Sequence, residues 1–163
     1  MKKYTLKIYP DSVLRETSRP VTEINGNTWR LLKGMCGIMY THKGIGLAAP
    51  QVGVLQRVII ADIGNGLISM INPEILTGFG EDFLEEGCLS LPEIFVSIKR
   101  NQSILVRYTD IHEKEKEQEL TGLTARVIQH EVDHLNGILI TDYQSLAERL
   151  HSMVKHKVAQ NEK

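Results

Sequence analysis

The sequence QHEVDHL, residues 129–135, places two histidines four residues apart, with a glutamate directly after the first histidine. On a helix, residues at i and i+4 lie on one face, so His130 and His134 can bind the same metal ion. The carboxylate of Glu131 starts beside the first ligand and can act as a general base on a water at that metal. The alternative is a helix whose two histidines share this spacing by chance.

A third metal ligand is expected from elsewhere in the chain, because catalytic metal centres usually have three protein ligands. Cys88, within EEGCLSLP at residues 85–92, is the best candidate. Its thiolate would complete a tetrahedral set with one position left for water. The alternative is an inert buried thiol. That structural role is also the one we expect for Cys36, which has no ligand partner at metal-motif spacing.

A third segment, GIGLAAPQVG at residues 44–53, is crowded with small residues. Its backbone can therefore approach a neighbour or a ligand closely. Gln51 is the only side chain in the segment that can donate a hydrogen bond. Taken alone, the segment also fits the tight start of a strand with Gln51 at the surface.

The composition is that of a soluble globular protein. The chain has 163 residues, of which 42% are hydrophobic and 24% are charged, and we expect one domain over residues 1–163. The formal net charge of -1 gives no general attraction to phosphate backbones, which argues against nucleic-acid binding. The sequence predicts no membrane span and no secretory signal, and two cysteines are too few for a disulfide scaffold. We therefore expect a cytoplasmic protein.

Hydrophobic periodicity predicts helices at residues 12–16, 28–40, 123–136 and 144–158. Runs rich in Val, Ile, Phe and Tyr predict strands at residues 57–62, 67–71, 79–84, 95–99, 103–108 and 116–120. Residues 113–117 alternate in charge and predict a solvated turn and strand edge. The last helix carries its apolar residues on one side and charged residues on the other, the apolar ones being Leu146, Leu150, Met153 and Val154.

The predicted strands lie too close in sequence for intervening helices, so the sheets should be largely antiparallel. The predicted fold is of the α+β class, with mainly antiparallel, short-stranded sheets packed around a central helix that carries the His-Glu-x-x-His motif. An N-terminal helix and a C-terminal helix complete this expected architecture.

Together the three segments resemble the peptide deformylases of the bacterial and organellar type. The family pattern consists of Gly-x-Gly-Leu-Ala-Ala-x-Gln, Glu-Gly-Cys-Leu-Ser and Gln-His-Glu-x-x-Asp-His-Leu. All three motifs occur here, complete and in the family's order, and the resemblance extends over about residues 10–142. A match to three motifs is far more specific than His-Glu-x-x-His alone, which also fits many zinc proteases.

The resemblance implies a metal-dependent hydrolase that removes the formyl group from N-formylmethionine of newly synthesised polypeptides and releases formate. Cys88, His130 and His134 would hold one divalent ion per chain, with Fe(II) expected and Zn, Ni or Co able to replace it. A water on the metal would attack the formyl carbon, and Glu131 would act as general acid and base.

The resemblance also implies roles for residues around the metal. The backbone N–H of Leu89 and the side-chain amide of Gln51 would stabilise the oxyanion of the tetrahedral intermediate. Gly46 and Gly87 would let an extended peptide pair with strand edges. By family position, the methionine pocket would be lined by Ile45, Leu84, Leu123 and Val127. The alternative for these four is that they are plain core residues.

The implied partners are N-formylmethionyl nascent peptides and the ribosome near its exit tunnel, and we expect a monomer. Some family members carry an arginine seven residues after the ligand cysteine, where this chain has Phe95, so substrate-backbone contacts on that side are in question. A pair between Arg100 and Asp133 would orient the helix or a ligand. Two alternative functions are a zinc endopeptidase of the His-Glu-x-x-His type and a catalytically inactive relative that only binds.

Overall fold

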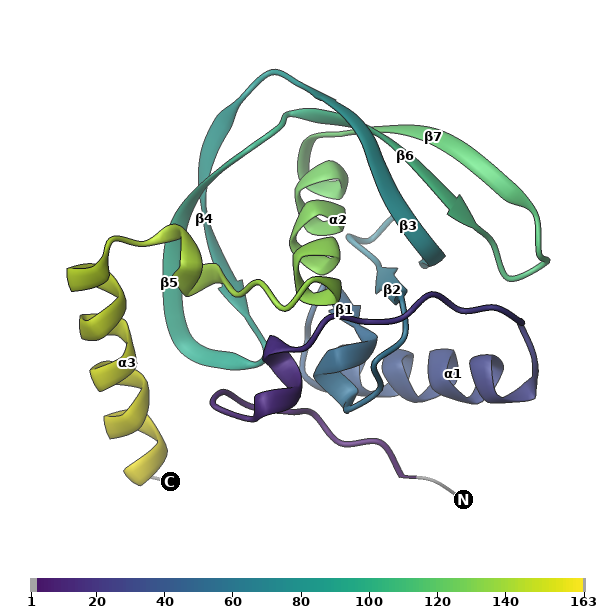
Figure 1. Cartoon of the computed structure of the whole chain (residues 1–163). Helices are drawn as coiled ribbons and strands as arrows, with labels where there is room; N and C mark the ends of the chain where they lie inside the picture. Colours follow the sequence, from purple (N-terminus) through teal and green to yellow (C-terminus); the bar gives the residue numbers. More distant parts are fainter. Residues whose placement is uncertain (1–2, 163) are drawn as a thin grey trace.

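The computed structural model describes residues 3–162, and within them two antiparallel sheets surround a central helix (Figure 1). The α-helices are α1 (Gly26–Thr41), α2 (Gly122–Leu135) and α3 (Leu146–Asn161), and the short 3-10 turns are η1 (Ser12–Arg15), η2 (Ala49–Val52) and η3 (Ile140–Tyr143). The strands are β1 (Gly46–Ala48), β2 (Val58–Ala61), β3 (Ile68–Phe79), β4 (Asp82–Cys88), β5 (Leu91–Arg100), β6 (Ser103–Thr109) and β7 (Glu115–Thr121).

Five strands form one sheet in the order β1-β2-β3-β6-β7, and β4 pairs with β5 in a second sheet. Each of these strand pairs is antiparallel, which confirms the predicted α+β class. In Figure 1, α2 stands between the β4–β5 hairpin and the larger sheet. Ile128, Val132 and Leu135 of α2 belong to the same buried cluster as residues of the larger sheet. No helix within residues 3–162 combines the length and apolar character needed to cross a membrane.

The boundary between β3 and β4 differs from the prediction. We expected one strand at residues 79–84, but β3 ends at Phe79, the chain turns at Gly80, and β4 begins at Asp82. Phe79 and Phe83 lie on two different strands, and their side chains are 62% and 66% exposed. The two phenylalanines therefore do not mark one buried strand. The predicted strand at 67–71 is only the first part of β3. The remainder of β3 lacks a regular alternation of buried and exposed side chains, so the sequence does not predict it. The alternation is interrupted at Asn72, which has a φ of 52°, and by a shift in the register of β3 against β6.

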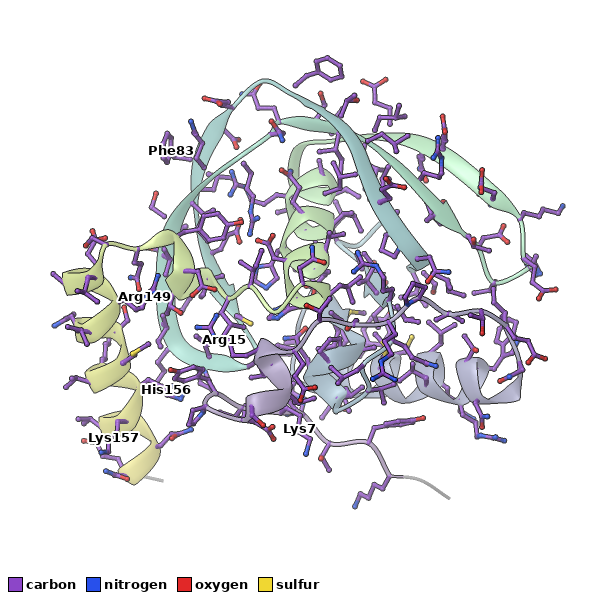
Figure 2. All side chains as sticks on the ribbon, viewed as in Figure 1. Lys7, Arg15, Phe83, Arg149, His156 and Lys157 are labelled. Atoms are coloured by element: carbon purple, nitrogen blue, oxygen red, sulfur yellow. The ribbon has the colours of Figure 1, made fainter. Side chains whose placement is uncertain are left out.

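Helix α3 turns an unexpected face toward the protein. Leu150 and Val154 are 55% and 64% exposed, whereas Ser152 and His156 are buried. His156 lies on the side of α3 that faces the rest of the molecule (Figure 2), and its Nε2 donates to the backbone oxygen of Tyr9 at 2.9 Å. The helix therefore makes buried polar contacts with the rest of the protein, while Leu146, Leu150 and Val154 of its apolar side face outward and Met153 is partly buried. It begins at Leu146 rather than residue 144, because the side chain of Ser145 caps its first turn.

The end of α2 provides a test of the fold. Gly137 follows the helix with a φ of 71°, and a Cβ there would lie 2.4 Å from the backbone oxygen of Arg15. We expect Gly137→Ala to lower the free energy of unfolding by about 2 kcal/mol or more, because left-handed backbone strain adds to this clash. Urea unfolding measures the change. Gly37→Ala, in α1 with open space around it, is the matched control and should stabilise by up to about 1 kcal/mol; equal effects of the two substitutions would contradict this account.

Candidate metal centre and substrate cavity

Three potential metal ligands meet where β4 ends against α2. The Sγ of Cys88 lies 3.3 Å from Nε2 of His134, and the Nε2 atoms of His130 and His134 are 3.2 Å apart. In a tetrahedral site with standard zinc bond lengths, two nitrogens lie about 3.4 Å apart and a nitrogen and a sulfur about 3.6 Å apart. The three donor atoms are therefore already placed as one divalent ion requires, and their chemistry suits a transition metal.

The backbone of β4 explains how Cys88 reaches the histidines. The pairing of β4 with β5 shifts register between Glu86 and Cys88, so the regular alternation of side chains ends just before the ligand. Such an irregularity can redirect a side chain. His130 and His134 need no such device, because both lie on the regular helix α2 at i and i+4.

Glu131 lies buried beside this centre. Its Oε2 has no hydrogen-bond partner among residues 3–162, and burial raises the pKa of its carboxyl to about 7. A Cβ on Gly46 would lie 2.4 Å from Oε1 of Glu131 and 2.7 Å from Cγ1 of Val127. Because glycine has no Cβ, β1 can approach α2 closely at position 46 without displacing the carboxylate of Glu131.

Gln51 is buried in η2, and its amide points toward Cys88. The side-chain oxygen accepts a hydrogen bond from the backbone nitrogen of Ala48 at 2.9 Å, which fixes the orientation of the amide. Its Nε2 donates to Oγ of Ser90 at 3.1 Å and lies 3.6 Å from Sγ of Cys88. The surface alternative for Gln51 is therefore excluded by its position.

A cavity of about 490 Å³ opens onto the centre. The residues of the sequence prediction that line it are Ile45, Gly46, Gln51, Gly87, Cys88, Leu89, Leu123, Val127, His130 and Glu131. His134 lies behind this lining and is almost fully buried. Leu84 is placed outside the lining: it lies on β4 opposite Ile98 and is half exposed. Arg126, in contrast, lines the cavity and donates hydrogen bonds to the backbone oxygen and the carboxylate of Asp82 at the start of β4.

Sequence reasoning missed Glu86, which contacts the candidate metal ligand His130 directly. Its Oε2 lies 2.9 Å from Nδ1 of His130, and Arg100 donates to both of its oxygens at 2.9 and 3.0 Å. Burial alone would raise the pKa of Glu86, but hydrogen bonds from Arg100 and His130 outweigh burial and lower it to about 2. An ionised Glu86 can only accept hydrogen bonds, so Nδ1 of His130 donates to it, which leaves Nε2 as the ring nitrogen that could bind a metal.

The expected pair between Arg100 and Asp133 is present, with Nη1 and Oδ2 2.6 Å apart. Arg100 thus joins Asp133 to Glu86, and Tyr143 also donates to Asp133. The sequence did contain a signal for Glu86, since a glutamate two positions before the candidate ligand Cys88 is a possible hydrogen-bond partner for a histidine ligand. The sequence alone does not show that Glu86 is buried.

Comparison with known proteins places the chain in a family. Residues 3–150 match the model of the polypeptide deformylase family. A peptide deformylase from Thermotoga sp. (strain RQ2) is 49% identical over 148 residues, which are 90% of each chain. The crystal structure of a peptide deformylase from Legionella pneumophila superposes with a TM-score of 0.93 at 34% identity, covering 98% of this chain and 96% of that one. That of Thermotoga maritima gives 0.85 at 46% identity, covering 89% and 99%. The chain belongs to the peptide deformylase family of enzymes.

Proposed function

We propose that this enzyme hydrolyses the formyl amide of N-formylmethionine at the start of newly synthesised polypeptides and releases formate. The observation that carries the proposal is the meeting of Cys88, His130 and His134 beside the buried carboxylate of Glu131 in one cavity. A divalent ion held by these three ligands would supply a Lewis acid that activates water. We propose Fe(II) as the natural ion, with Zn, Ni or Co able to occupy the site.

Glu131 is the proposed general acid and base. Its carboxylate accepts a proton from the attacking water and returns it to the amine nitrogen when the C–N bond breaks. The raised pKa of its buried carboxyl, about 7, suits a group that must both take up and release a proton near neutral pH. Its Oε2 supports this role, because no hydrogen bond from the described part of the chain competes for the proton.

Two donors are proposed for the oxyanion of the tetrahedral intermediate. One is Nε2 of Gln51, whose amide is already held by Ala48 and Ser90, and the other is the backbone N–H of Leu89. Donors fixed before the reaction stabilise developing charge without the cost of reorganisation. Both residues line the cavity next to Cys88, which supports their assignment.

The cavity walls fit a methionine side chain and an extended peptide. Ile45, Leu123 and Val127 present apolar side chains to the cavity, and Val127 lies on α2 one turn before His130. Gly46 and Gly87 lie in β1 and β4, strands that each have one unpaired edge and could add a peptide strand. We propose that the enzyme works as a cytoplasmic monomer close to the ribosome exit tunnel, where its substrates emerge.

The test of this function is a formate-release assay with formyl-Met-Ala-Ser. We expect formate release with the internal peptide bonds left intact; cleavage of those bonds would instead favour a zinc endopeptidase. Glu131→Ala should lower kcat by at least about 100-fold, because the proton acceptor is lost, while bound metal stays stoichiometric. Glu119→Ala, at an exposed position on β7, is the control and should retain activity. Unchanged turnover in Glu131→Ala would refute the general-base assignment.

Gly46 gives a second test of the catalytic geometry. We expect Gly46→Ala to lower kcat/KM by about 100-fold, because its Cβ would displace the carboxylate of Glu131, and a shift of about 1 Å can have an effect of that size. Metal content should be unchanged, since the atoms nearest to the added Cβ belong to Glu131 and Val127 and not to the three proposed ligands. Gly37→Ala adds the same methyl group in open space on α1 and should leave kcat/KM at the wild-type value. A fully active Gly46→Ala enzyme would show that Glu131 does not need this position.

A further inference from the structure

Arg126 extends the contacts of Glu86 to a second acidic residue. It lies on α2 one turn before His130 and is 5% exposed. Its Nη1 donates to Oε1 of Glu86 at 2.8 Å and to the backbone oxygen of Ile98 at 3.0 Å. Its Nη2 donates to the backbone oxygen of Asp82 at 3.1 Å and to the Asp82 carboxylate. Because residues at i and i+4 share a helix face, Arg126 and His130 reach the two oxygens of one carboxylate.

The charges along this path alternate in sign, with three carboxylates and two guanidinium groups. Glu86 lies between two buried arginines, and each arginine has a second acidic partner, Asp133 for Arg100 and Asp82 for Arg126. A single carboxylate cannot neutralise two guanidinium groups, so the outer acids allow both arginines to remain buried. The carboxylate of Glu86 is thereby held from two directions, by β5 through Arg100 and by α2 through Arg126.

We propose that Arg126, anchored by Asp82, is a positioning residue for the metal centre, which holds Glu86 against Nδ1 of His130 and so slows release of the ion. Arg126 lines the cavity, but its side-chain hydrogen bonds within residues 3–162 go to Glu86, Ile98 and Asp82 rather than to one of the three candidate metal ligands. Its effect must therefore pass through Glu86. The proposal rests on the metal site of the proposed function.

Without Arg126, Oε1 of Glu86 would keep only its contact with Arg100, and of the two arginines only the one on β5 would hold the carboxylate in place. The hydrogen bond to His130 would lengthen, and the imidazole would lose the partner that fixes its orientation. Loss of a hydrogen-bond partner of this kind typically lowers metal affinity by about 10- to 100-fold. A purely structural role of Arg126, joining α2 to β4, predicts lower stability of the metal-free and metal-loaded proteins alike.

The experiment measures release of Zn²⁺ from the full-length, zinc-loaded protein into excess chelator. We expect Arg126→Met to release the ion about 10- to 100-fold faster than the wild type. Arg126→Lys keeps the charge, but its single ammonium group cannot replace the two guanidinium nitrogens that contact Glu86 and Asp82. Its rate of Zn²⁺ release should therefore fall between those of the wild type and Arg126→Met. The control is Arg107→Met, which removes an exposed pair with Glu117 on β7 and should release Zn²⁺ within two-fold of the wild-type rate.

Asp82→Asn keeps the test decisive if Arg126→Met fails to fold, because the Asp82 side chain is 40% exposed and the substitution removes the charged anchor of Arg126 while the arginine itself is retained. It should release Zn²⁺ more than two-fold faster than the wild type. A second readout is the rise in Tm on loading with Zn²⁺, which should be smaller in both variants because binding free energy adds to folding free energy.

Two results would overturn the proposal. One is release within two-fold of the wild-type rate in folded Arg126→Met or, if that variant does not fold, in Asp82→Asn. The other is an equal loss of Tm with and without zinc, which assigns Arg126 a structural role alone. Failure of the wild-type protein to bind Zn²⁺ would instead count against the metal site itself, so the two failures are distinguishable.

Discussion

The burial of one carboxylate, Glu86, determines how β4 meets α2. A buried carboxylate is costly unless it is paired and hydrogen-bonded. The groups that satisfy Glu86 come from other elements, with Arg100 at the end of β5 and Arg126 and His130 on α2. β4 can therefore bury this residue only by lying against α2. Two positions further along the same strand, Cys88 is brought to the histidines by that contact.

Two buried carboxylates near the centre have opposite environments. Burial raises the pKa of Glu131 to about 7, and its Oε2 accepts no hydrogen bond from any of the described residues. Burial would raise that of Glu86 as well, but donors from Arg100 and His130 lower it to about 2. Two carboxyl groups whose pKa values differ this much can take different roles in one site. Glu86 stays ionised and orients a ligand, while Glu131 remains able to take up and release a proton.

The sequence predicts the parts of the site that depend on local spacing and misses those that depend on burial. His130 and His134 follow from helix periodicity, and Cys88 follows from the number of ligands a metal needs. Leu84 was assigned to the pocket by family position, yet the structure leaves it half exposed outside the cavity. Arg126 stands at a position that resembles the family's, but the sequence assigns it no role, because a charged residue on a helix usually faces water and its buried partners are visible only in three dimensions.

The same limit explains the errors in the fold. The apolar stripe of α3 at Leu146, Leu150 and Val154 has helical spacing, but spacing does not say which face meets the protein. The buried contact is made by His156, which donates to the backbone oxygen of Tyr9. Nor does periodicity detect the interruption at Asn72 within β3, where a local change in register conceals the continuation of the strand.

The two sides of the catalytic centre are stabilised by different kinds of contact. On the His130 side, ion pairs among buried charges fix the ligand through Glu86. On the Gln51 side, the N-terminal segment supplies backbone hydrogen bonds: the nitrogen of Lys7 donates to the oxygen of Gln51 at 2.7 Å, and that of Tyr9 donates to the oxygen of Ser90 at 2.8 Å. Ser90 in turn accepts from the amide of Gln51. Loss of an ion-pair partner leaves a buried charge unpaired, whereas loss of a single backbone hydrogen bond has a smaller effect. The orientation of His130 is therefore more sensitive to a single substitution than that of Gln51.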